Sequence, residues 1–206
     1  MYIYVKRIID FILSLIALII LSPLFLILAL WIKLDSKGPV FFRQKRIGKN
    51  RTFFQIYKFR TMLTEASDDR PTHLLEDPEA IITKPGRFLR KMSLDELPQL
   101  INILKGEMAV IGPRPALWNQ EDLADERDKY GANDVLPGLT GWAQINGRDV
   151  LSIKVKAQLD GEYIQMMSFW FDLGCFFGTF LSILKSDGVV EGGTGTLKKN
   201  KNITKL

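Results

Sequence analysis

The chain has 206 residues, with 28 lysines and arginines against 23 aspartates and glutamates, and its formal net charge is +5. This balance favours an anionic partner such as phospholipid, nucleic acid or a phosphorylated substrate. A single cysteine, Cys175, and a single histidine, His73, exclude an internal disulfide and give no basis for a zinc site or a Ser-His-Asp mechanism.

Residues 8–32 form an apolar segment whose length suits a bilayer span of about 20 residues. Basic residues lie on both sides of it, with Lys6 and Arg7 before it and several more after it. Because positive residues mark the cytoplasmic side, these flanks favour a helix whose two ends stay on one side. Ser22-Pro23 supplies a bend, since proline removes a backbone donor and a serine hydroxyl can satisfy a freed carbonyl. A kinked spanning helix remains the alternative.

Residues 39–48 and 51–59 alternate apolar, aromatic and basic residues around the turn sequence GKN, which predicts two short strands. Interleaved aromatic and basic side chains could follow a nucleic acid. Beside an apolar anchor, a membrane surface is the stronger interpretation, because aromatics settle at headgroup depth and cations meet anionic lipid.

The rest of the chain is predicted to be mostly helical, with few and short strands. We expect a surface loop at 64–80, a helix at 87–105 with a break or kink at Pro98, a short strand at 107–115, a polar helix at 118–131, a glycine-rich loop at 136–149 and an apolar helical stretch at 161–188. The predicted fold class is therefore α+β, mostly helical, with several amphipathic helices lying on the membrane rather than through it.

Two adjacent carboxylates, Asp95 and Glu96, lie in the sequence SLDELPQ, residues 93–99. Ser93 and Glu96 have capping-box spacing, so helix capping is one interpretation. Pro98 fits poorly into such a helix, because it would lie in the second turn and remove a hydrogen bond. A chemical role is the alternative, since carboxylates bind magnesium and can attack phosphorus to form an acyl phosphate.

Basic residues recur in loops beside glycine or proline, where the backbone is restrained and side chains can converge. Arginine binds phosphate in a bidentate manner, so such residues beside two carboxylates suit a magnesium ion with a diphosphate. Taken singly, each is more simply a solvated surface residue. The residues of this kind are Lys58, Arg60, Arg87, Arg90, Arg114 and Arg148.

The motifs KFRTM, RKMSLDELPQLINILKGEM, VIGPRP and LPGLTGWAQINGR follow one another behind an apolar segment with Ser-Pro. In this order and spacing the chain resembles the bacterial sugar transferases, the monotopic phosphoglycosyl transferases, over about residues 1–190. It resembles the small form, a catalytic domain with no extra membrane helices before it. The resemblance implies a re-entrant membrane helix at 1–33, a catalytic domain at 34–190 and a basic tail at 191–206.

The resemblance also implies a reaction. Members of this family transfer a sugar 1-phosphate from a UDP-sugar to undecaprenyl phosphate at the cytoplasmic face of the bacterial inner membrane, with magnesium as cofactor. The resemblance assigns the nucleophile, which carries a covalent phosphosugar, to Asp95, and it assigns metal binding or proton transfer to Glu96. Both acids are the predicted metal ligands. The predicted substrate- and phosphate-binding residues are Lys58, Arg60, Arg90, Arg114 and Arg148, and Ser22 and Pro23 fall on the family's helix break.

Three functional hypotheses follow from the sequence. The first is this transferase, the second is a lipid-binding adaptor whose acids only cap a helix, and the third is a single-step metal enzyme acting on a lipid diphosphate. The partners expected of the transferase are a UDP-sugar, undecaprenyl phosphate and membrane phospholipid, without nucleic acid and with a homodimer left open. The sequence does not select the sugar or the glycan pathway.

Overall fold

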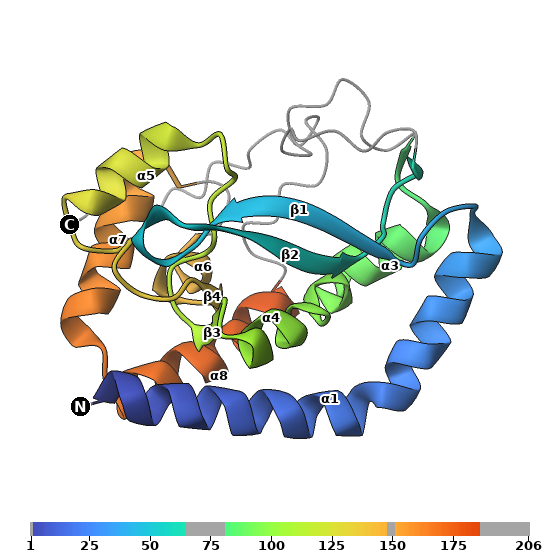
Figure 1. Ribbon diagram of the computed structural model, residues 1–206, viewed down its shortest axis with the longest axis horizontal. Helices are drawn as coiled ribbons and strands as arrows, with labels where there is room; N and C mark the ends of the chain where they lie inside the picture. Colours follow the sequence, from blue (N-terminus) through green and yellow to red (C-terminus); the bar gives the residue numbers. More distant parts are fainter. Residues whose placement is uncertain (1, 65–80, 148–150, 186–206) are drawn as a thin grey trace.

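A computed structural model describes residues 2–64, 81–147 and 151–185, and Figure 1 shows how their elements are arranged. The helices are α1 (Tyr2–Asp35), α3 (Lys84–Lys91), α4 (Gln99–Lys105), α5 (Glu121–Asp128), α6 (Trp142–Ile145), α7 (Ile153–Met166) and α8 (Phe169–Lys185). The strands are β1 (Phe41–Ile47), β2 (Phe53–Phe59), β3 (Ala109–Ile111) and β4 (Gly138–Thr140), with short 3₁₀ turns η1 (Lys49–Arg51) and η4 (Leu94–Glu96). The predicted class, α+β and mostly helical, is confirmed. Nearly all of the predicted loop at 64–80, and the predicted tail at 191–206, lie outside the described residues.

Helix α1 is continuous from Tyr2 to Asp35 but bends, so that one arm runs beneath the body and the other rises beside it (Figure 1). Pro23 lies inside the helix and has no N–H to offer the carbonyl of Ile19, four residues back. The Ser22 hydroxyl donates a hydrogen bond of 2.8 Å to that carbonyl. Within the described residues, α1 is the one helix long and apolar enough to cross a membrane.

Both arms of α1 pack on the same globular body. Leu18 and Leu21 of the first arm pack against a core cluster that contains Ile103 of α4. Leu28 and Ile32 of the second arm share a cluster with Phe59 of β2. Because each arm buries apolar area against the body, the bent helix and the body form one packed unit.

A polar stripe on the first arm of α1 faces the body. Lys6, Asp10 and Ser14 are spaced four residues apart, so they lie on one helix face, and all three are buried. The Lys6 ammonium lies 2.7 Å from Asp172 of α8, which also accepts a 2.9 Å hydrogen bond from the Tyr163 hydroxyl of α7. A buried charge of this kind needs a partner, so the stripe fixes which face of α1 turns inward.

Strands β1 and β2 form the predicted antiparallel hairpin, which crosses the upper part of the molecule in Figure 1. Phe41 pairs with Phe59 at one end and Ile47 pairs with Phe53 at the other. This register brings Lys58, opposite Phe42, to the end of the hairpin near α3 and η4. The hairpin therefore places Lys58, one of the predicted phosphate-binding residues, beside the turn that carries the two acids.

The helix predicted at 87–105 with a break or kink at Pro98 is two helices, α3 and α4, joined by η4, so the break is confirmed but it is longer than predicted. The interruption begins at Ser93, whose φ of 54° and ψ of 22° are left-handed, a conformation uncommon for a residue other than glycine. The Ser93 side chain makes no capping hydrogen bond. The capping-box interpretation of Ser93 and Glu96 is therefore wrong, while Pro98 lies just before α4, where proline costs little.

The strand predicted at 107–115 is confirmed as β3, but the prediction of an irregular loop throughout 136–149 is wrong in part. That segment contains β4, which pairs parallel to β3, and the short helix α6. A Cβ atom at Gly138 or Gly141 would overlap the backbone of Gly112. The glycines thus let two backbones approach closely. Because glycines are also typical of irregular loops, the sequence did not indicate a strand here.

The predicted polar helix at 118–131 contains α5, and the apolar stretch at 161–188 divides into the end of α7 and the whole of α8. Helix α8 turns large apolar side chains outward: Trp170 is 76% exposed and Phe177 is 59% exposed. With the exposed outer side of α1, α8 therefore gives the molecule an extensive apolar surface, which marks a site of membrane or protein contact.

Candidate active site

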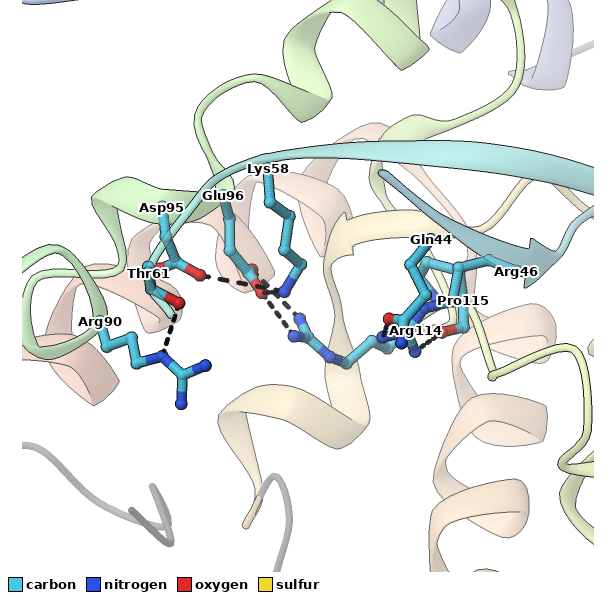
Figure 2. A network of polar contacts seen from close by, with 9 residues as sticks. All are labelled: Gln44, Arg46, Lys58, Thr61, Arg90, Asp95, Glu96, Arg114 and Pro115. Atoms are coloured by element: carbon cyan, nitrogen blue, oxygen red, sulfur yellow. Dashed lines mark hydrogen bonds and ion pairs between the residues drawn. The ribbon is translucent and has the colours of Figure 1, made fainter. Parts of the chain in front are cut away.

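The two adjacent acids lie in η4, in the short connection between α3 and α4, and face the end of β2 (Figure 2). The side chain of Asp95 is 13% exposed and that of Glu96 is 17% exposed. Carboxylates withdrawn this far from water are costly unless cations compensate them. The left-handed turn at Ser93 directs the chain into this arrangement, so backbone strain accompanies the acids.

Two cations from different elements converge on Glu96. The Lys58 ammonium lies 2.7 Å from Glu96 Oε1. The Arg114 guanidinium, from the turn after β3, lies 2.5 Å from Oε1 and 3.2 Å from Oε2, which is a bidentate pair (Figure 2). Lys58 is more distant from Asp95, at 4.0 Å. Glu96 is therefore held firmly, while the Asp95 carboxylate is less closely paired.

The two neighbouring carboxylates have opposite electrostatic behaviour. Burial raises the pKa of Asp95 to about 6, partly offset by Lys58 and reinforced by the charge of Glu96. Burial also acts to raise the pKa of Glu96, but Arg114 and Lys58 outweigh it and hold that pKa well below its ordinary range. Adjacent acids whose pKa values are shifted in opposite directions are typical of sites in which the two acids have different chemical roles.

A third cation approaches Asp95 from α3. The charge of Arg90 favours the ionised form of Asp95 and so acts to lower its pKa. The Arg90 Nε donates a 2.9 Å hydrogen bond to the Thr61 hydroxyl, just beyond the end of β2 (Figure 2). Thr61 is buried, and its carbonyl accepts a 3.0 Å hydrogen bond from the backbone of Thr83, which caps α3. These contacts join the end of β2 to α3 and hold the Arg90 side chain beside the two acids.

The structure brings Lys58, Arg90 and Arg114 to the two acids, as the sequence analysis expected of residues that share a site. It does not bring Arg60 there. The buried Arg60 guanidinium instead donates to the carbonyls of Ile32, Ser36 and Lys37, at the C-terminal end of α1. Carbonyls at a helix end lack helical partners, so Arg60 caps α1. Arg148 lies outside the described residues.

Sequence reasoning missed three residues beside this cluster. Thr61 supports Arg90, and Gln44 of β1 accepts a hydrogen bond from Arg46, which also contacts the backbone next to Arg114 (Figure 2). Thr61 could have been noticed because it lies in the motif KFRTM. The sequence does not reveal the role of this pair, because the Pro115 carbonyl that Arg46 contacts is 69 residues away along the chain.

The donor atoms of the cluster suit a hard cation. Among the residues that the structure describes, no group of three or more His, Cys, Asp or Glu side chains could hold a metal by itself. Magnesium does not require such a group, because it binds through one or two carboxylates together with substrate phosphates. Asp95 and Glu96 supply that minimal set. The Asp95 oxygens are the more available, since both oxygens of Glu96 face cations.

Comparison with known proteins gives a consistent match along the chain. The sequence model of the family described as bacterial sugar transferase matches residues 1–186. An undecaprenyl-phosphate glucose phosphotransferase of Komagataeibacter xylinus is 42% identical over 186 residues, covering 84% of this chain and 35% of the relative. An uncharacterized sugar transferase of Bacillus subtilis, EpsL, is 41% identical and covers 90% of both chains.

A third relative, from Aeromonas hydrophila, is a UDP-N-acetylgalactosamine-undecaprenyl-phosphate N-acetylgalactosaminephosphotransferase, 38% identical over 195 residues. The match covers 91% of this chain and 45% of that relative. The chain thus spans less than half the length of the Komagataeibacter and Aeromonas proteins but nearly the whole of EpsL.

Proposed function

Since this chain belongs to the bacterial sugar transferase family, we propose that it transfers a sugar 1-phosphate from a UDP-sugar to undecaprenyl phosphate. The products are undecaprenyl diphosphate-sugar and UMP. The observation that carries this proposal is the convergence of Lys58, Arg90 and Arg114 on two adjacent, largely buried carboxylates, one firmly paired and one less so. Such a site suits a diphosphate substrate and a carboxylate that reacts with it.

The proposed reaction has two steps at one phosphorus atom. An oxygen of ionised Asp95 attacks the phosphorus that carries the sugar, the bond from that phosphorus to the oxygen of UMP breaks, and UMP leaves. An oxygen of undecaprenyl phosphate then attacks the same phosphorus and displaces Asp95 as a carboxylate. A covalent intermediate lets UMP depart before the lipid arrives, so one site serves two large substrates in turn.

The side chains around Asp95 have separate roles in this scheme. The raised pKa of Asp95, due mainly to burial, makes the carboxylate a stronger nucleophile than an exposed aspartate while leaving most of it ionised at pH 7. Glu96 stays ionised beside Lys58 and Arg114. We therefore assign it the role of binding cations rather than that of a proton acceptor. Arg90 and Arg114 flank the acids and would bind the phosphate oxygens of the donor.

Magnesium is the cofactor we propose for this site, held by Asp95 or Glu96 together with oxygens of the substrate diphosphate. When bound, it neutralises phosphate charge that would otherwise repel an attacking carboxylate. The chain's own contribution is to present hard oxygen ligands beside cationic side chains.

We also propose that α1 is re-entrant and that the body lies at the cytoplasmic face of the bacterial inner membrane. Near its start, Lys6 pairs with Asp172 of α8, and Arg7 donates to the carbonyls of Ile103 and Leu104 at the end of α4. At its other end, the last turns are capped by Arg60. These contacts of both ends with one body support the re-entrant course, because a straight spanning helix would separate its ends by a hydrocarbon core of about 30 Å.

A panel of UDP-sugars, each incubated with the protein, undecaprenyl phosphate and magnesium, tests the function through release of UMP. We expect release with at least one donor and none from Asp95→Asn. Mass spectrometry of Asp95 peptides after reaction with donor alone should find the added phosphosugar. Absence of UMP with every donor would refute the transferase, and UMP release without modified Asp95 would favour a single-step route.

A further inference from the structure

The turn that carries Arg114 is held by hydrogen bonds on both sides of that residue. Before Arg114, the carbonyl of Pro113 accepts a 2.8 Å hydrogen bond from the backbone of Gly138 in β4. After Arg114, the carbonyl of Pro115 accepts a 3.1 Å hydrogen bond from the Arg46 guanidinium of β1. The first contact comes from β4, which pairs parallel to β3, whereas the second comes from a side chain of the distant hairpin.

Arg46 is itself held in place within the hairpin. Its second guanidinium nitrogen donates a 2.6 Å hydrogen bond to the Gln44 side chain, two residues earlier on the same face of β1 (Figure 2). The adjoining backbone is paired as well, since the N–H of Ile47 donates to the Ala116 carbonyl at 2.9 Å. Gln44 is buried, so the bond between the two side chains is shielded from water.

The hairpin register places this pair on the same face as Lys58. Phe42 is opposite Lys58, and Gln44 and Arg46 follow at alternate positions from Phe42. Two residues on one face of the hairpin therefore influence Glu96, one by direct contact and one indirectly. Lys58 reaches it directly at 2.7 Å, and Arg46 fixes the backbone from which Arg114 reaches it.

We propose that Arg46, oriented by Gln44, is a positioning residue that aligns Arg114 with Glu96 and with the donor diphosphate. The alignment with the donor diphosphate rests on the proposed function, whereas the alignment with Glu96 does not. The Arg114 side chain is 40% exposed and has several rotatable bonds, so its aim depends on a fixed backbone. A bidentate pair is sensitive to that aim, because both N–H groups must point at the carboxylate together.

A double-mutant cycle tests this role. Arg46→Met keeps the apolar stem and removes the hydrogen bonds to Gln44 and Pro115, and we expect it to lower kcat/KM for the donor by about tenfold to a hundredfold. In an Arg114→Met background the same change should alter kcat/KM by less than twofold, because no guanidinium remains to be aligned. Arg46→Lys, which can still donate to one acceptor, should recover part of the loss. Equal losses in both backgrounds would overturn the proposal.

A matched control and a second readout separate this inference from the proposed function. Arg43→Met removes an exposed cation of the same strand that lies over the Tyr57 ring, and it should leave kcat/KM unchanged. Titration of ¹³C-labelled Glu96 needs no turnover: Arg46→Met should raise the pKa of its carboxylate. An unchanged Glu96 titration would refute the positioning role even in an active enzyme. If the wild-type protein releases no UMP, the proposed function fails while the titration still decides the role of Arg46.

Discussion

The ammonium of Lys58 lies 2.7 Å from Glu96 but 4.0 Å from Asp95, although the two acids are adjacent in the chain. Arg114 increases the difference, because its guanidinium pairs with both oxygens of Glu96. The structure thus makes two neighbouring carboxylates unequal, and the inequality leads to predictions for each.

Asp95→Asn should abolish turnover and stabilise the fold at neutral pH. Burial raises the pKa of Asp95 from 3.8 to about 6, so the folded state binds this proton more tightly than the unfolded state. The stability from this group is complete below pH 3.8 and is lost as the pH rises through 6. At pH 7.5 the amide should raise the free energy of unfolding by about 1–3 kcal/mol. Melting temperatures in detergent at pH 7.5 and pH 4 check this, because the gain should vanish at the lower pH.

Glu96→Gln should have the opposite effect on stability. The folded pKa of Glu96 is held well below its ordinary value of 4.5 by Arg114 and Lys58, which outweigh burial. Its contribution is therefore present above pH 4.5 and is lost as the pH falls. The variant should melt at a lower temperature than wild type at pH 7.5, because two cations lose a largely buried partner. Equal or higher melting temperature would contradict the pairing as a stabilising feature.

The first half-reaction should depend on the ionisation of Asp95. With donor and no lipid acceptor, the single-turnover release of UMP should fall about tenfold per pH unit below about pH 6 and level off above about pH 7. Omitting the acceptor matters, because its phosphate titrates in the same range. Quenched-flow measurement from pH 4.5 to 8 gives the profile. A rate that stays constant down to pH 4.5 would exclude Asp95 as a nucleophile with this pKa.

Chelation should stop the reaction and magnesium should restore it. The candidate ligands are carboxylate and phosphate oxygens, which suit magnesium better than zinc. UMP release should be lost after EDTA treatment and return when magnesium is added, with a smaller effect of zinc. Full activity after exhaustive chelation would remove magnesium from the proposal.

The bend in α1 should be required for its topology. Replacing Ser22 and Pro23 with Ala and Leu removes the hydroxyl that donates to Ile19 and restores the missing N–H. A straight segment of 25 residues would extend about 37 Å, enough to span a bilayer with some tilt. A cysteine at Tyr4, which is 79% exposed, reports the position of the N-terminus when Cys175 is changed to Ser.

In wild-type cells this reporter should resist a membrane-impermeant thiol reagent until lysis, and in the straightened variant it should react before lysis. A cysteine at Glu121, on an exposed position of α5, is the matched control and should stay protected in wild-type cells. Labelling at Tyr4 in intact wild-type cells would show a spanning helix, without bearing on the chemistry of Asp95.

The local pattern of the sequence determined the elements that depend on neighbouring residues. The apolar run with Ser22-Pro23 predicted the long N-terminal helix, and the alternation at 39–59 predicted the hairpin, because these signals act over a few residues. The capping-box interpretation of Ser93 is wrong because the spacing of two residue types is a weak local signal, and it does not reveal that the Ser93 backbone is left-handed.

By itself, the sequence determined which residues are present: two adjacent acids, a set of cations and a long apolar segment. Only the tertiary structure decided which cations reach the acids, because that depends on contacts between segments far apart in the chain. Lys58 and Arg60 lie two residues apart, yet one pairs with Glu96 and the other caps α1. Likewise, the contact of Arg46 with the Pro115 carbonyl exists only because the hairpin packs against the turn after β3, a long-range pairing that no short-range pattern encodes.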